Sequence, residues 1–247
     1  MSHELLPAHH THTHAFPVVQ RTTIRFFRRM SRTTLGFFGG LGARVLFLRD
    51  LKRALAEPDT YLPLIVRQMR AIGVDSVPLV VMVAAFIGGV IAIQVRYQLF
   101  PGIQLSIVGL SSRQITVLET GPLLTGLVLA GRVGAKMTAE IGTMRVTEQI
   151  DALETLAYDP VAYLVVPRLI AAVLMLPVLV LLADVIGVLS GAGAAVFVAG
   201  VKMSDFRDGV RLGYGHFQVA YSLIKATLFG GAIAYLCTYE GYVTQAG

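Results

Sequence analysis

Residues 77–95 read VPLVVMVAAFIGGVIAIQV, a run of nineteen residues without a charged side chain. A helix of this length crosses a hydrocarbon core of about 30 Å. Gln94 is its one strongly polar group, and Ala84 and Gly88 give it a face of small residues for close contact with another helix. The stretch therefore predicts a transmembrane helix.

Three further apolar stretches cover about residues 115–135, 160–201 and 217–238. Because about forty residues of helix measure about 60 Å, the stretch 160–201 is either two tightly joined spans or one span with a helical extension. Of the 247 residues, 55% are hydrophobic and 15% charged, and the mean hydropathy is +0.67. Soluble domains carry about 25% charged residues. We therefore predict an all-α, polytopic membrane protein with about four spans.

The chain before the first span is basic. Residues 1–20 hold five of the six histidines, which indicates either a metal-binding tract or, as we favour, a disordered tail. Residues 21–53 hold nine of the 21 Lys and Arg residues, interleaved with aromatic and aliphatic side chains. We predict an interfacial region with an amphipathic helix over residues 21–75 and a transmembrane permease domain over 76–247. Membrane contact accounts for the net charge of +6, so no nucleic-acid partner is expected.

The sequence carries no motif of an enzyme or of a metal site. Cys237 is the only cysteine, and His216 is the only histidine outside the tail. Residues 131–136 superficially resemble a nucleotide-binding loop but belong to an apolar stretch. We therefore expect no catalytic residue, no bound metal and no cofactor in this chain.

Residues 137–159 interrupt the apolar pattern with five of the 15 acidic residues. Their spacing predicts a short amphipathic helix at about 140–158, which Pro160 ends. This helix is either a solvated connector or a docking surface for a cytoplasmic partner, and its density of polar groups makes docking at least as plausible. The candidate docking residues are Glu140, Arg145, Thr147, Glu148, Gln149, Asp151 and Glu154.

The same part of the chain resembles the MlaE/YrbE family of ABC-transporter permeases. The family pattern is roughly E-x-G-P, then A-G-R-x-G-x-x-x-x-A-E-x-G-x-M-R-x-T-E-Q, then D-P and P-R. The sequence meets it between Glu119 and Pro122, between Ala130 and Gln149, and at Asp159, Pro160, Pro167 and Arg168. It departs from the family at Leu118, where an arginine or another polar residue is usual. Family members also continue beyond the position of Gly247 with a fifth span.

The resemblance implies a homodimeric, multi-pass permease in the cell inner membrane that moves phospholipid and helps maintain outer-membrane lipid asymmetry. Its implied partners are a cytoplasmic ABC ATPase that binds ATP and Mg²⁺, an MCE-domain lipid carrier and, in some systems, a STAS-domain protein. The polar helix would dock on the ATPase. The family topology makes residues 202–216 periplasmic, although Lys202, Arg207 and Arg211 in that loop argue mildly against this orientation.

A path for acyl chains needs apolar walls and a few polar groups at its mouth. The alternative role for each of these apolar residues is ordinary packing between helices. The face of the first span that carries Ala84 and Gly88 is the one expected to pack tightly against another helix. The candidate lipid-cavity residues are Phe86, Ile87, Val90, Ile91, Gln94, Tyr97, Glu119, Leu123 and Leu127.

Three charged residues within apolar spans need polar partners, because a charge facing lipid is costly. We expect Glu119 to face the cavity or a partner on another helix, unless it only complements its helix dipole. We expect Lys225 and Arg132 each to reach the interface or to pair with an acid or with backbone carbonyls, and Glu140 is the nearest candidate partner of Arg132 in sequence. The alternatives to transport are a structural membrane scaffold and, less favoured, an intramembrane enzyme that uses Glu119 or His216.

Overall fold

The computed structural model describes residues 39–40, 42–56 and 58–244. The predicted tail over residues 1–20 and residues 21–38 of the predicted interfacial region lie outside this part of the chain. The chain divides into two units, residues 1–47 and 48–247. In the first unit the described residues are helical, and the second unit is the helical bundle described below. No β-strand occurs in the described ranges, so the predicted all-α class is confirmed.

The described helices include four that are long and apolar enough to cross a membrane, as predicted. They cover Tyr61–Gln98, Ser106–Val146, Val161–Phe197 and His216–Val243. The first begins within α2 (Pro58–Ile72), continues through a short 3₁₀ turn and ends with α3 (Val77–Gln98). Pro78 lies in the first turn of α3, where its missing N–H leaves no helical hydrogen bond unmade.

The second span is a helix that two π-turns interrupt. It comprises α4 (Ser106–Ile115), a π-turn at Thr116–Thr120, α5 (Gly121–Leu129), a π-turn at Ala130–Gly134 and α6 (Ala135–Val146). Pro122 explains the first interruption, because it has no N–H to donate to the Leu118 carbonyl four residues earlier. π-turns within helices are frequent at functional sites.

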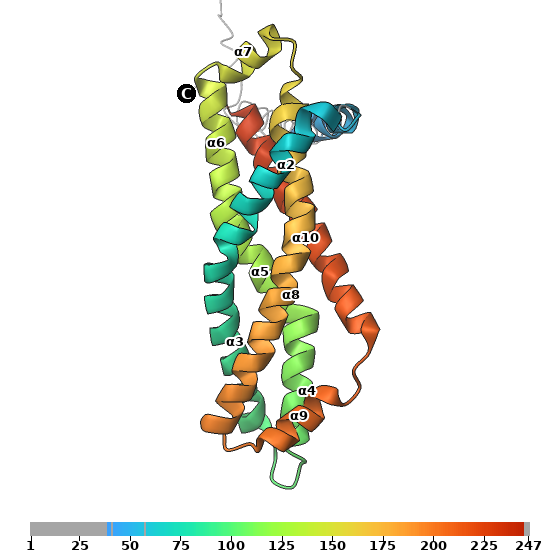
Figure 1. Ribbon diagram of the computed structural model, residues 1–247. Coiled ribbons are helices and arrows are strands. Elements are labelled where there is room, and N and C mark those ends of the chain that lie inside the picture. The colour runs from blue at the N-terminus through green and yellow to red at the C-terminus, as the bar shows by residue number, and fades with distance from the viewer. Residues whose placement is uncertain (1–38, 41, 57, 245–247) are drawn as a thin grey trace, which may run out of the picture. The chain divides into compact units, whose positions relative to one another are not determined.

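The third span is one continuous helix, which decides between the two alternatives for residues 160–201. A π-turn at Val161–Val165 leads into α8 (Val166–Phe197), whose 32 residues measure about 48 Å. α8 packs against α2, α3, α5 and α10, so it is the central helix of the bundle (Figure 1). A Cβ on Gly88 of α3 would lie 2.1 Å from the carbonyl oxygen of Gly187, so only glycine permits this contact. The predicted tight packing of the small-residue face is thereby confirmed.

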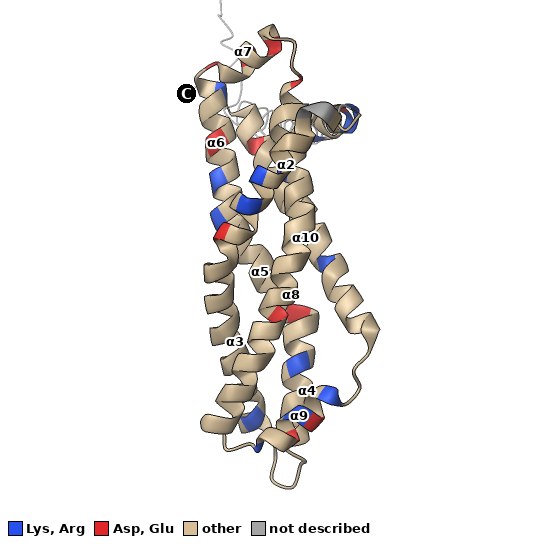
Figure 2. Ribbon diagram, in the orientation of Figure 1, with Lys and Arg blue, Asp and Glu red and all other residues tan. Residues whose placement is uncertain are grey.

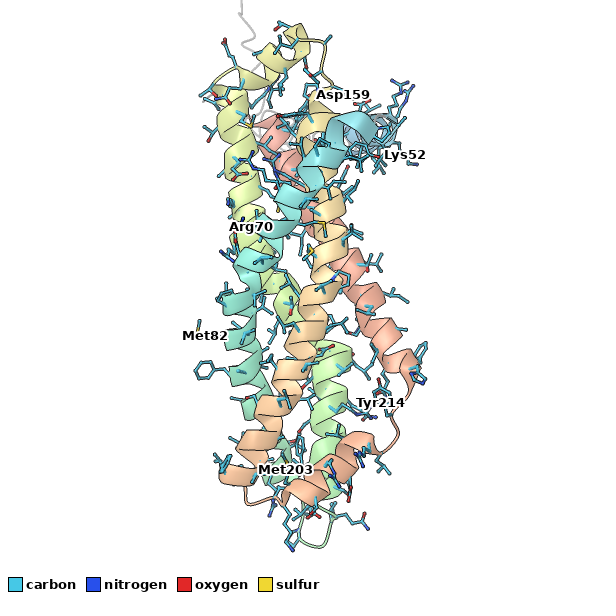
Figure 3. The ribbon with its side chains drawn as sticks, viewed as in Figure 1. Lys52, Arg70, Met82, Asp159, Met203 and Tyr214 are labelled. Atoms are coloured by element: carbon cyan, nitrogen blue, oxygen red, sulfur yellow. The ribbon has the colours of Figure 1, made fainter. Side chains whose placement is uncertain are left out.

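Two ends of the bundle can be distinguished. One, the α7 end, carries the start of α2, the end of α6, α7 (Gln149–Thr155) and the end of α10 (Figure 1). The other, the α9 end, carries α9 (Met203–Arg211), which packs against α4, and the start of α10 (His216–Val243). Asp159 lies at the α7 end, and Met203 and Tyr214 lie toward the α9 end (Figure 3). Charged residues gather toward the two ends, and few lie between them (Figure 2).

The polar segment, for which one helix over about 140–158 is predicted, is divided in the structure. α6 continues the second span as far as Val146, and α7 begins at Gln149. Between them Glu148 has a φ of 59°, in the left-handed region. Because a residue in this region cannot continue a right-handed helix, the chain turns at Glu148.

Candidate functional site

A salt bridge joins the second span to the last one inside the apolar part of the bundle. Lys225 of α10 lies with its Nζ 3.2 Å from Glu119 Oε2. Nζ also donates to the Leu118 carbonyl oxygen at 2.8 Å, an acceptor that is available because Pro122 has no N–H. The same ammonium lies 4.5 Å from the centroid of the Tyr221 ring, within cation–π range. Glu119 and Lys225, each predicted to need a polar partner, therefore form one intramembrane ion pair.

The two members of the intramembrane ion pair differ in exposure. The Lys225 side chain is 23% exposed, whereas that of Glu119 is 70% exposed. Leu123 and Leu127, one and two helical turns beyond Glu119, are also exposed. The carboxylate therefore lies on an open, otherwise apolar face of α5 and the preceding π-turn.

The candidate lipid-cavity residues of α3 lie on two different faces. One face is exposed and carries Phe86, Val90, Gln94 and Tyr97. Met82, also on α3, points away from the bundle (Figure 3). Ile87 and Ile91 instead line a narrow apolar cavity together with Leu124 of α5. Within this single chain the structure thus brings Ile87 and Ile91 together with α5 and leaves the other four residues open.

α8 carries a buried carboxyl, Asp184. In the sequence it is a single acid in a long apolar run, which predicts no function for it. Asp184 is 6% exposed, and its Oδ2 accepts a hydrogen bond from Ser222 Oγ at 3.3 Å. A Cβ on Gly121 would lie 1.9 Å from Asp184 Oδ1. Since Gly121 follows Glu119 by two residues and Ser222 precedes Lys225 by three, Asp184 belongs to the same polar layer as the intramembrane ion pair.

The candidate docking residues surround the turn between α6 and α7. Arg145 pairs with Asp151 at 2.7 Å, and both side chains are partly exposed. Thr147 donates to the Thr143 carbonyl at 2.8 Å, which closes the last turn of α6. Exposed side chains at this turn and on α7 include Glu148, Gln149, Asp151 and Glu154. Six of the seven candidates therefore lie at or near the turn, and Glu140 lies farther back on α6.

The predicted pair of Arg132 and Glu140 is wrong. Arg132 donates to the Asp75 carbonyl and, at 3.1 Å, to Ser76 Oγ, at the junction of α2 and α3. Glu140 pairs with Arg168 of α8 at 3.1 Å. Eight residues of helix separate Arg132 from Glu140 by about 12 Å along the axis, so the nearest acid in sequence is not a neighbour in space. The alternative expectation, that Arg132 pairs with backbone carbonyls, is confirmed at Asp75.

Metal ligands are not clustered in the described residues: they contain no group of three or more His, Cys, Asp and Glu side chains that could hold an ion. Five of the six histidines belong to residues 1–20, outside those ranges. The polar groups that the structure does bring together are suited to binding and ion pairing.

Comparison with known proteins identifies the family. The sequence profile described as "Permease MlaE" matches residues 65–247. A probable ABC transporter permease protein of Rickettsia prowazekii is 40% identical over 228 residues, which are 88% of this chain and 84% of the relative. The intermembrane phospholipid transport system permease protein MlaE of Haemophilus influenzae is 30% identical over 223 residues, 89% of this chain and 84% of that protein.

A plant protein is also similar. The chloroplastic protein TRIGALACTOSYLDIACYLGLYCEROL 1 of Arabidopsis thaliana is 32% identical over 182 residues, 73% of this chain and 52% of that protein. The profile match covers well over half of the chain and includes all four spans from residue 65 onward. This chain therefore belongs to the MlaE family of permeases.

Proposed function

We propose that this chain is the permease subunit of an ABC transporter that moves phospholipid between a membrane and an MCE-domain lipid carrier. A separate ATPase subunit binds ATP and Mg²⁺ and supplies the energy, and this chain itself binds no cofactor. The observation that carries the proposal is the intramembrane ion pair, whose Glu119 carboxylate is open on an apolar face. Two relatives whose names specify ABC transport or phospholipid transport support the same class.

The ion pair is suited to an exchange of partners with a lipid headgroup. The Lys225 ammonium can leave Glu119 for the phosphate of a phospholipid, while the Leu118 carbonyl still holds its Nζ. The exposed apolar residues Leu123 and Leu127 lie where the acyl chains would follow. A polar anchor beside apolar walls is the arrangement that a lipid needs.

A second copy of the chain would enclose this face. A carboxylate at the bilayer centre costs about 2.5–3.5 kcal/mol, and less near the interface, so the open side of Glu119 is unsuited to face acyl chains directly. Two copies that face each other would place Glu119, Phe86, Val90 and Leu127 around a shared cavity. We therefore propose a homodimer, with Ile87, Ile91, Gln94 and Tyr97 contributing to its walls and mouth.

The α7 end is proposed to be cytoplasmic in an inner membrane. Residues 49–70 carry five Lys and Arg residues and residues 132–146 carry three, against one in residues 96–105 and three in residues 202–211 at the α9 end. This bias follows the positive-inside rule. The exposed acids Glu148, Asp151 and Glu154 then face the cytoplasm, where the ATPase and, in some systems, a STAS-domain protein would dock.

The test is co-purification of the full chain with an ATPase, followed by measurement of phospholipid-dependent ATP hydrolysis in vesicles. Glu119→Gln and Lys225→Met should abolish the dependence on lipid, and Lys202→Met, at the exposed α9 end, is the matched control. A photocrosslinker at Leu127 should trap phospholipid, and one at Ala84, which faces α8, should trap protein. Equal ATP hydrolysis with and without lipid in the unaltered complex would instead support a structural scaffold.

A further inference from the structure

A second polar region lies at the α7 end of the bundle, apart from the intramembrane ion pair. It is a cavity of about 720 Å³ bounded by α2, α6, the π-turn at Val161–Val165 and the start of α8. Its charged lining residues are Arg67, Asp75, Arg132, Lys136, Glu140 and Arg168. Four cations therefore face two carboxylates, an excess of two positive charges. We call this space the arginine cavity.

The carboxylates do not neutralise all four cations. Glu140 is shared between Arg168 at 3.1 Å and Lys136 at 3.8 Å. The hydrogen bonds of Arg132 to described residues have neutral acceptors, the Asp75 carbonyl and the Ser76 hydroxyl. Neither Arg132 nor Arg67 has an ion pair within the part of the chain that the structure describes. Among the described residues, two guanidinium groups therefore line the cavity without a carboxylate partner.

The uncharged part of the lining is mixed: a smaller group of its side chains is polar, and the larger group is apolar. Leu64 and Ile72 of α2, Val133 and Met137 of the second span, and Leu164 line the same space. A site for a small soluble anion needs cationic donors but no apolar wall. Guanidinium donors beside aliphatic side chains instead fit a phosphate group attached to acyl chains, and basic pockets between transmembrane helices bind anionic lipid headgroups.

We propose that the arginine cavity binds the phosphate group of an anionic phospholipid from the leaflet at the α7 end. Arg67 and Arg132 donate to the phosphate oxygens, and the aliphatic lining contacts the glycerol and the first acyl carbons. The site is distinct from the proposed lipid path. The two proposed phosphate positions are separated, because Glu119 at the ion pair and Arg132 at the cavity are thirteen residues apart in the second span, or about 20 Å. Because the inference rests on this cavity alone, it can fail while the transport proposal stands.

The test measures lipid binding to the full chain, purified in detergent and stripped of lipid, by native mass spectrometry. Phosphatidylglycerol is the anionic probe, phosphatidylcholine the neutral one, and inorganic phosphate the soluble competitor. We expect one phosphatidylglycerol per chain to bind more tightly than any phosphatidylcholine. Arg67→Gln should weaken this binding about tenfold, because one hydrogen bond between charged groups contributes about that much to an affinity. Arg67→Gln/Arg132→Gln removes two such bonds and should weaken binding about a hundredfold.

The controls keep the result independent of folding. Arg67 makes no hydrogen bond or ion pair in the described residues, so Arg67→Gln leaves the fold intact, and Arg67→Lys should retain most of the binding. Lys202→Gln/Arg207→Gln removes the same charge from exposed positions at the α9 end and should change nothing. Equal binding of the two phospholipids, or equal losses in the cavity and control variants, would overturn the proposal. If inorganic phosphate displaced phosphatidylglycerol when both are present at the same concentration, the site would bind soluble phosphate and the proposed lipid ligand would be wrong.

Discussion

The intramembrane ion pair and the arginine cavity both contain cationic side chains, but these side chains are compensated in different ways. In the apolar part of the bundle the Lys225 ammonium is matched by one carboxylate, one carbonyl and one aromatic ring. At the α7 end, Arg67 and Arg132 lack carboxylate partners in the described chain. Water and lipid headgroups can solvate a charge near the membrane surface but not within the hydrocarbon. A charged side chain without an ion-pair partner is therefore tolerated only where water or a lipid headgroup can reach it.

The comparison predicts its largest effect when one cation is removed from each region. Lys225→Met should lower the free energy of unfolding by about 2 kcal/mol. Loss of one partner from a fully buried pair costs about 3–5 kcal/mol, and Glu119 is largely exposed. Arg67→Met should change it by less than about 0.5 kcal/mol, as for an ordinary surface position. Reversible unfolding in mixed micelles measures both, and equal losses would contradict the comparison.

A double-mutant cycle sharpens the first result. Glu119→Gln/Lys225→Met leaves no uncompensated charge, so it should recover about 1–2 kcal/mol relative to the sum of the two single variants. Lipid-dependent ATP hydrolysis should stay lost, because the headgroup anchor is gone. Strict additivity of the two unfolding energies would show that the 3.2 Å contact contributes no coupling.

The predictable part of the fold is the part that hydropathy determines. The four spans follow from apolar runs, and the need of Glu119 and Lys225 for polar partners follows from the cost of charge in hydrocarbon. Their pairing was not predictable, because 106 residues separate them. Glu140 is the nearest acid to Arg132 in sequence, but the acceptors of Arg132 lie 56 and 57 residues earlier. The sequence predicts both Phe86 and Ile87 as cavity residues. It does not show that α5 packs beside the face of α3 that carries Ile87 and leaves the face that carries Phe86 exposed.

A smaller effect is expected at the exposed pair of Arg145 and Asp151. Exposed ion pairs contribute about 0–1 kcal/mol, so single alanines should barely change the unfolding energy. If α7 docks on an ATPase, Glu148→Lys/Asp151→Lys should nevertheless uncouple ATP hydrolysis from lipid while the chain stays folded and inserted. Arg145→Asp/Asp151→Arg, which restores the pair in reverse, is the control for folding. Unchanged ATPase binding and turnover in the double lysine variant would contradict the docking role.

The smallest effect concerns the turn itself. Glu148 has a φ of 59°, which glycine adopts without strain, so Glu148→Gly should stabilise the fold by about 0.5 kcal/mol. Glu154→Gly, within α7, should destabilise it by about 0.5–1 kcal/mol. The same unfolding assay applies to both, and a loss in both variants would place Glu148 in ordinary helical backbone.

The carbonyl of Leu118 has a consequence for how the ion pair can be studied by mutagenesis. Every residue offers a carbonyl, so Leu118→Ala would keep the acceptor of Lys225 and would score as a silent position in an alanine scan. The residue that governs this acceptor is Pro122, which makes no contact with the ammonium in any described interaction. An alanine at Pro122 would supply an N–H that competes for the same oxygen. The identity of residue 122 thus determines whether the carbonyl of residue 118, one helical turn earlier, is free to accept a hydrogen bond from Lys225.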